Sequence, residues 1–178
     1  MADHLKLRVK DAEQVQLIQS AAMEFQRLLG EIANGQPLTR ASVTDIRLPR
    51  LPLGQTLRGV GPLWRLALVL GLSADLGARR TPSNDKITRE ALEGEEADLL
   101  MSAYASIARS VQDMGLEGVW DLKPMLNGSE VTRILPNLPR GPEFSIVMSK
   151  QIEWGIENPG ATREDTAEYL KTSFKHFC

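Results

Sequence analysis

Side chains capable of chemistry are few in this chain and lie far apart along it. The densest group is an acidic cluster formed by Glu93, Glu95, Glu96 and Asp98. Carboxylates so close together could hold a metal ion or exchange protons, but a run of charge is more often the solvated face of a helix, and we favour that interpretation. The single cysteine, Cys178, and the two histidines, His4 and His176, lie near the chain ends. We therefore predict no Cys–His catalytic pair and no zinc site built on these residues.

The motifs of the common catalytic sites do not occur in the sequence. There is no HExxH, GxSxG, P-loop or GxGxxG pattern. Nucleotidyl transfer needs carboxylates that clamp two metal ions. In nucleotidyltransferases an Asp-x-Asp that follows a Gly-Ser pair supplies them. The chain has one such pair, Gly128-Ser129, but no Asp-x-Asp, and we interpret the pair as the end of a turn and the cap of the next helix. We expect no catalytic residue, no metal ligand and no cofactor in these residues, and whether the chain belongs to an enzyme stays open.

Composition and charge predict a folded protein whose charge is unevenly distributed along the chain. The 178 residues are 42% hydrophobic and 25% charged, with a net charge of −2. Residues 40–84 hold seven arginines against two acidic residues, whereas residues 85–122 hold three basic and nine acidic ones. The longest apolar run, residues 66–72, is shorter than the about 20 residues that cross a bilayer. We expect no membrane segment and a soluble intracellular protein, with the cytoplasm, nucleus and mitochondrion all open as its compartment.

The first two thirds of the chain show helical periodicity. Residues 5–10 alternate apolar and basic side chains and predict a short extended lead-in, followed by a long amphipathic helix over 11–33 with Asp11 as its N-cap. Residues 39–58 predict two short helical turns. A helix from Gly61-Pro62 to about residue 72 is apolar nearly all round, which predicts the buried centre of the fold. A further helix is predicted over 87–114, with Gly115 as its C-terminal cap.

From residue 121 the elements become short and are separated by prolines and glycines. We predict helices at 129–135, 142–157 and 162–174, the last opened by a capping box from Thr162 to Asp165. The predicted fold class is all-α: an irregular bundle of about six to seven helices with a smaller C-terminal helical tail. We divide the chain into a helical region, 1–120, and a smaller C-terminal helical region, 121–178.

A resemblance to a known family rests on this last region. The pieces that carry it are Asp121-Leu-Lys-Pro-Met-Leu-Asn-Gly-Ser-Glu, Leu138-Pro-Arg-Gly-Pro, Gln151-Ile-Glu-Trp, Asn158-Pro and Thr162-Arg-Glu-Asp-Thr-Ala-Glu-Tyr-Leu. Together they resemble the C-terminal end of the class II, eukaryotic-type CCA-adding tRNA nucleotidyltransferases. Upstream, Leu53-Gly-Gln-Thr-Leu-Arg and Gly61-Pro-Leu-Trp-Arg-Leu-Ala-Leu are similar to the body of those enzymes, less specifically.

The resemblance implies an all-α module that binds tRNA and positions it for CCA addition at the 3′ end. In it residues 1–120 would be a body-like region and residues 121–178 a tail-like RNA-binding region. The catalytic head of the family is not present in these residues, so it does not imply an active enzyme. The partners implied are tRNA and either a catalytic nucleotidyltransferase head or a larger assembly. Two alternatives stay open: a non-catalytic structural subunit of a ribonucleoprotein or protein assembly, and a helical adaptor that binds only protein.

The candidate RNA-binding residues fall into two groups. In the tail-like region, Gly141 opens a helix where backbone N–H groups could meet a phosphate. The basic side chains that could add charge-assisted contacts there are Arg140, Lys123 and Arg133. The second group lies in the arginine-rich segment and comprises Arg47, Arg50, Arg79 and Arg80. For this second group, ion pairing with the acidic segment inside the fold is an equal alternative, and for Arg58 and Arg65 it is the preferred one.

Overall fold

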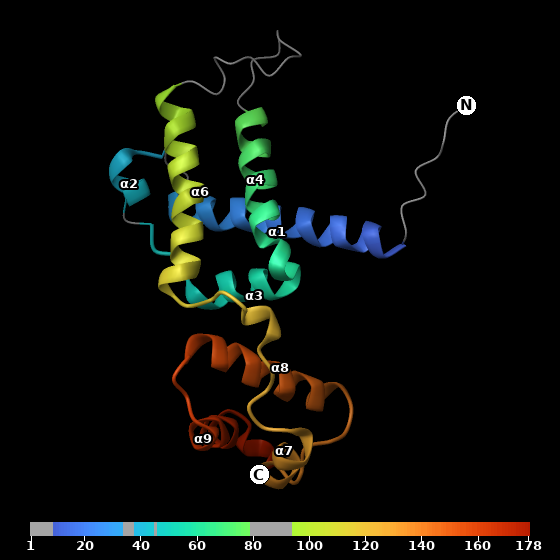
Figure 1. The fold of residues 1–178 in the computed structure, drawn as a ribbon. Helices are drawn as coiled ribbons and strands as arrows, with labels where there is room; N and C mark the ends of the chain where they lie inside the picture. Colours follow the sequence, from blue (N-terminus) through green and yellow to red (C-terminus); the bar gives the residue numbers. More distant parts are fainter. Residues whose placement is uncertain (1–8, 34–37, 45, 79–93) are drawn as a thin grey trace, which may run out of the picture. The chain divides into compact units, whose positions relative to one another are not determined.

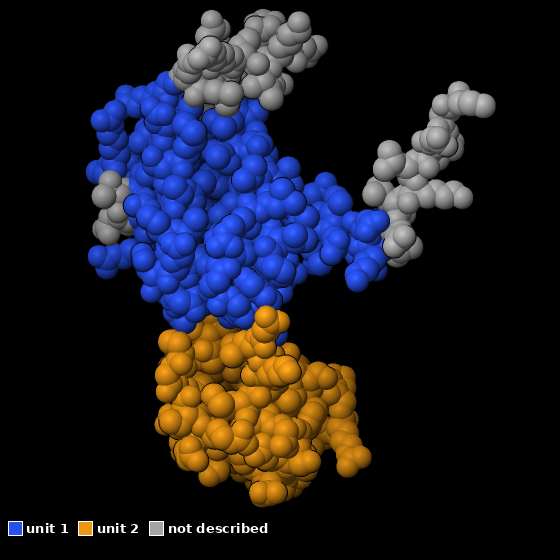
Figure 2. Space-filling view, viewed as in Figure 1, with its two compact units in different colours: residues 1–120 blue, residues 121–178 orange. Residues whose placement is uncertain are grey.

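A computed structural model describes residues 9–33, 38–44, 46–78 and 94–178. Over these residues every regular element is helical, so the all-α prediction is confirmed for the described part of the chain. The chain forms two compact units, residues 1–120 and residues 121–178, which are coloured separately in Figure 2. Each unit is described by itself.

The first unit begins with the long helix α1, Val9–Ala33. The prediction of a helix over 11–33 is confirmed, but its start is wrong by two residues, because Val9 and Lys10 are helical rather than extended. Asp11 consequently lies in the first turn and is not the N-cap. The rest of the predicted lead-in lies outside the described residues. In the second half of the helix Ala22, Phe25 and Leu29 are buried.

The arginine-rich segment forms helices α2, Arg40–Thr44, and α3, Arg50–Val60. Helix α3 is longer than the helical turn expected there. It ends at Gly61, whose φ of +63° is a backbone conformation that favours glycine. A single 3-10 turn, Gly61–Leu63, then redirects the chain into α4, Trp64–Ala78, as Figure 1 shows.

The stretch Arg50–Ala78 is long and apolar enough to cross a membrane by length and composition. The core helices of soluble proteins meet the same two criteria. The bend at Gly61–Leu63 divides the stretch into an 11-residue and a 15-residue helix, each shorter than the about 20 residues of a typical span.

Helix α4 corrects one prediction. Its residues Trp64, Ala67 and Leu68 are buried, as expected of a central helix. Its opposite face is not, because Leu66 is 53% exposed and Val69 59% exposed. The prediction that this helix is the buried centre of the fold therefore holds for one face only, the face that carries Trp64, Ala67 and Leu68.

Helix α6, Glu95–Asp113, completes the first unit. Gly115 follows it with φ of +61°, and the N–H of Leu116 donates to the carbonyl of Val111 (2.9 Å). This bond closes the end of the helix. The predicted capping role of Gly115 is confirmed, because Gly115 takes the left-handed position directly after the last helical turn and the C-cap residue Met114. The first part of the predicted 87–114 helix lies outside the described residues.

Helices α1, α4 and α6 meet at Gly71. A Cβ atom there would lie 3.2 Å from the carbonyl oxygen of Ala22 in α1 and 3.0 Å from the hydroxyl of Tyr104 in α6. Beside this contact the carboxylate of Asp75 accepts hydrogen bonds from Gln26 Nε2 (2.5 Å) and Tyr104 Oη (2.7 Å). Burial and the Asp75 carboxylate both raise the pKa of Tyr104, which stays a neutral donor. One carboxylate therefore links all three helices.

The second unit contains α7, Gly128–Ile134, α8, Pro142–Glu157, and α9, Arg163–Ser173, followed by the 3-10 turn Lys175–Phe177. The three predicted helices are confirmed to within a residue at either end. Its small core consists of Leu126, Val131, Leu135, Leu138, Val147 and Leu170. The chain end is held as well, because Asn137 Nδ2 donates to the carbonyl of Cys178 (2.8 Å).

We predict that Gly71→Ala lowers the free energy of unfolding by about 1–2 kcal/mol, because the added methyl must displace either helix backbone or the bonded Tyr104 ring. Gly30→Ala is the matched control, since its Cβ would meet nothing within 4 Å and should add about 0.5–1 kcal/mol. Urea unfolding measures both. Equal stabilisation by the two substitutions would contradict this prediction, because it would show that the crossing of α1 and α4 can hold a methyl group at position 71.

Candidate nucleic-acid interface

The first turns of α7 and α8 border a surface hollow of about 670 Å³ in the second unit. The residues that line it are Asn127, Gly128, Ser129, Thr132, Arg140, Gly141 and Phe144. The two helix starts lie close together because Gly128 has no side chain: a Cβ there would be 3.1 Å from the Phe144 ring. The chain thus brings two residues of the sequence prediction, Arg140 and Gly141, into one concave site.

Gly141 sets the backbone at the mouth of this hollow. It is the N-cap of α8 with φ of +134°, a conformation that L side chains rarely adopt. No side chain caps α8, and Pro142 supplies no N–H. The N–H groups of Glu143 and Phe144 lie in the first turn, where a helix has no internal acceptor for them. These donors sit at the positive end of the helix dipole, where an anion is stabilised.

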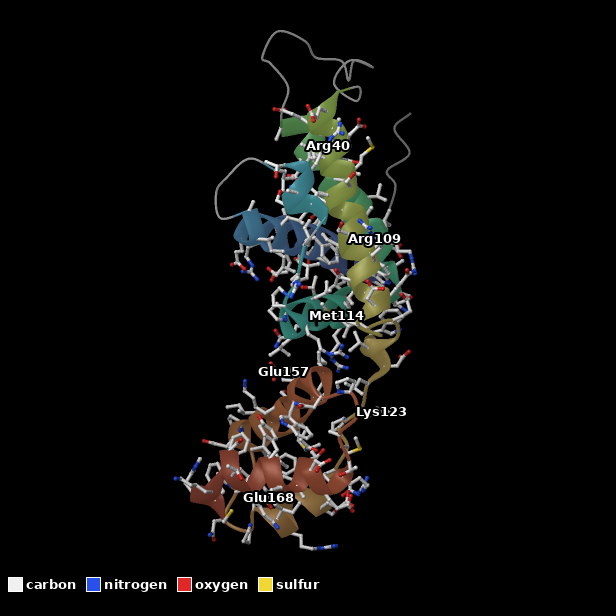
Figure 3. The ribbon with its side chains drawn as sticks, turned by 90° about the vertical axis from the view of Figure 1, so that its left-hand side faces the viewer. Arg40, Arg109, Met114, Lys123, Glu157 and Glu168 are labelled. Carbon is white, nitrogen blue, oxygen red and sulfur yellow. The ribbon has the colours of Figure 1, made fainter. Side chains whose placement is uncertain are left out.

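Arg140 supplies the charge at this hollow. Its side chain is exposed, and it makes no ion pair or hydrogen bond with any residue that the structure describes. Arg133 on α7 and Lys123, which precedes α7 (Figure 3), are exposed as well, but neither lines the hollow. The structure therefore groups Arg140 with Gly141 and leaves Arg133 and Lys123 outside that group.

The Gly128-Ser129 pair has a different local role from the one predicted. Asn127 is the N-cap of α7, and its side chain accepts from the N–H of Glu130 (3.1 Å). The Glu130 carboxylate in turn accepts from the N–H of Asn127 (2.8 Å). Asn followed three residues later by Glu was the signal for this cap in the sequence. The capping residue is Asn127, so the pair itself supplies only the first helical positions.

Arg163 is a structural residue that the sequence reasoning missed. Its guanidinium donates to the carbonyl of Met125 (2.6 Å) and pairs with the carboxylate of Glu130. The start of α9 is thereby tied to the start of α7. The predicted capping box of α9 is confirmed: Thr162 accepts from the N–H of Asp165 (3.1 Å), and Asp165 accepts from the N–H of Thr162 (2.9 Å).

Several of the described arginines of the first unit have hydrogen-bond or ion-pair partners within the fold. Arg50 donates to the carbonyl of Met114, labelled in Figure 3, at 2.6 Å, and Arg58 donates to the carbonyl of Val119 at 2.9 Å. Arg65 pairs with Glu117 at 3.2 Å, in line with the preferred alternative for that residue. Arg47 is exposed but has interactions within the chain.

Arg79 and Arg80, the remaining candidates of the arginine-rich segment, lie outside the described residues, as does Glu93 of the acidic cluster. Another member of that cluster, Glu95, pairs with Arg40 at 3.3 Å. Among the residues that the structure describes, no group of three or more acidic, histidine or cysteine side chains could hold a metal ion.

Comparison with known proteins identifies one class of relative. The chain is 29% identical over 119 residues to tRNA nucleotidyltransferase cca1 of Schizosaccharomyces pombe, which is 67% of this chain and 22% of that protein. It is 23% identical over 167 residues to the mitochondrial CCA tRNA nucleotidyltransferase of Saccharomyces cerevisiae, which is 94% of this chain and 27% of that protein. A 71-residue match to tRNA nucleotidyltransferase cca2 of S. pombe is 28% identical and covers 40% of this chain and 14% of that protein.

These matches confirm the similarity to CCA tRNA nucleotidyltransferases over part of the chain. The chain spans about a quarter or less of the length of these relatives. No family model matches the chain. No solved structure matches it either.

The two capping boxes predict how the second unit responds to acid. The Asn127 backbone N–H and then Arg163 lower the pKa of Glu130 below 4.5, and the Thr162 backbone and side chain lower that of Asp165 below 3.8. A lowered folded-state pKa stabilises the fold above the ordinary value, and this contribution is lost as the pH falls through the folded-state pKa.

We therefore expect amide-exchange protection in this unit, read at Val131 and Leu170, to fall between pH 6 and pH 3. The decrease should be smaller in a Glu130→Gln/Asp165→Asn variant, which starts from lower protection at pH 6. Parallel pH curves for the two proteins would show that these carboxylates carry none of the acid sensitivity.

Proposed function

We propose that this chain is a tRNA-binding helical region of a CCA-adding type of protein, which positions tRNA for addition at its 3′ end by a catalytic head outside these residues. The observation that carries the proposal is its similarity to three CCA tRNA nucleotidyltransferases, in one case over 94% of the chain. Their names make tRNA the substrate to test. The part of tRNA that we propose as the contact is the elbow, where the acceptor and T arms stack.

The hollow at the starts of α7 and α8 is the proposed phosphate contact. Arg140 offers a guanidinium with no competing partner among the described residues, and the first turn of α8 adds backbone donors beside it. Arginine pairs with phosphate through two parallel hydrogen bonds. Folded RNA is recognised mainly by shape, phosphates and 2′-hydroxyls, so a site of this kind needs few base-reading side chains.

The remaining candidate RNA-binding residues are ranked by the exposure of their side chains and by the hydrogen bonds that they already make. Arg133 and Lys123 are exposed and suit additional contacts to the RNA backbone. We place Arg50 below them, because its hydrogen bond to Met114 already occupies part of its guanidinium. We keep Arg47, which is exposed, as a further candidate. Arg79 and Arg80, which lie outside the described residues, also stay in the proposal.

A structural subunit of a larger assembly is the second candidate function. The apolar face of α4 favours it, since Leu66, Val69 and Leu70 are 53%, 59% and 39% exposed. Contiguous apolar surface of this kind is typical of a face covered by protein. The same binding experiment separates the two candidates.

Fluorescence anisotropy with labelled full-length tRNA and with an acceptor-stem minihelix that lacks the elbow, over a series of salt concentrations, tests the proposal. We expect tighter binding of the full tRNA and a log affinity that falls linearly with log salt. The absence of binding to either RNA at physiological salt would contradict autonomous tRNA recognition and favour the assembly subunit.

We predict that Arg140→Ala weakens binding of full-length tRNA about tenfold at low salt and reduces the salt slope by about 1. Lys171→Ala removes one positive charge from the last turn of α9, outside the hollow, and serves as the matched control with little change. Equal losses in both variants would show that only overall charge matters and that Arg140 has no specific contact.

A further inference from the structure

A second hollow of the same unit, of about 700 Å³, lies where α8 ends and α9 begins. One wall is aromatic: the rings of Trp154 and Tyr169 stack with centroids 5.1 Å apart and planes 18° apart. Both side chains are half-buried, and Pro159 and Ala161 of the connecting loop extend the apolar surface. The groove therefore has one apolar wall, whose aromatic rings are partly exposed.

The rim of this groove is acidic. Glu157 and Glu168, labelled in Figure 3, line it from α8 and α9, together with Asp165. Among the described residues that line the groove, none is basic. Asp165 is engaged in the capping box of α9, whereas Glu157 and Glu168 are exposed and make no ion pair within the described structure.

Lys150 on α8 interacts electrostatically with Glu157 of the groove, but its hydrogen-bond partner is another carboxylate. It donates to Glu153 at 2.6 Å, and that carboxylate, with smaller contributions from Tyr169 and Glu157, raises the pKa of Lys150. Its charge is therefore balanced by Glu153, which does not line the groove. The carboxylates of Glu157 and Glu168 remain for an external cation.

The dipole of α8 also favours a cation at this groove. This 16-residue helix is about 24 Å long, with the Arg140 hollow at its positive end and the acidic groove at its negative end. A phosphate is favoured at the first end and disfavoured at the second. The groove is therefore not an extension of the proposed RNA contact.

We propose that this groove binds an arginine or lysine side chain from a basic segment of a partner protein. The cation lies against the Trp154–Tyr169 wall, where the ring faces are negative, and its charge faces the carboxylates of Glu157 and Glu168. Arginine fits best, because its planar guanidinium both stacks on aromatic rings and pairs with carboxylates. The proposal stands on groove chemistry alone and does not require tRNA binding.

The test is a titration of the full chain with a fluorescein-labelled octapeptide of alternating alanine and arginine, with a glutamate-for-arginine peptide as the probe control. We expect binding of the arginine peptide alone, weakened by salt, with the Trp154 indole N–H as the most shifted tryptophan signal in the NMR spectrum. The Glu157→Gln/Glu168→Gln variant should bind about tenfold more weakly, since it removes two charge contacts. Glu143→Gln removes an exposed carboxylate at the other end of α8 and should bind as the unchanged protein does.

Three outcomes would overturn the proposal. The first is unchanged affinity in the Glu157→Gln/Glu168→Gln variant, and the second is an equal loss in Glu143→Gln. The third is a Trp154 signal that responds to a single-stranded oligoribonucleotide and not to the arginine peptide, which would make the aromatic wall a base-stacking site. Because Glu157 and Glu168 do not line the hollow that contains Arg140, failure of this proposal and failure of tRNA binding are read separately.

Discussion

The close crossing of α1 and α4 at Gly71 is the constraint on which the first unit depends. The carbonyl of Ala22 and the ring of Tyr104 occupy the space that any other residue at position 71 would need. This approach lets Gln26 of α1 and Tyr104 of α6 each donate to one oxygen of the Asp75 carboxylate. A half-buried carboxylate shared by three helices is most stable when both donors are in place, so one small residue and one bonded acid set how α1, α4 and α6 meet.

That packing also explains why α4 has two unlike faces. Its inner side is filled by Trp64, Ala67 and Leu68, and the guanidinium of Arg65 lies 4.4 Å from the centre of the Trp64 ring. Its outer side keeps Leu66 and Val69 in contact with solvent. Removing apolar surface from water is favourable, so this face is where protein contact would add most to stability.

The second unit is organised along α8. Its positive end carries Arg140 and backbone donors, and its negative end carries the aromatic groove with Glu157 and Glu168. We propose that these ends serve different partners, RNA at one and a basic protein segment at the other. The relatives that the chain is similar to are CCA tRNA nucleotidyltransferases, and the chain spans about a quarter or less of their length.

Local signals in the sequence determined several helices of this protein. The period of the α1 stripe, Pro142 at the start of α8 and the Thr162–Asp165 cap act over three or four residues, and each predicted an element that the structure contains. Only the tertiary structure decided which side of α4 is covered, that Arg50 bonds to Met114, and that Trp154 stacks on Tyr169. Those outcomes depend on segments 15 to 64 residues apart, and side-chain periodicity shows which face of a helix is apolar but not what will pack against it.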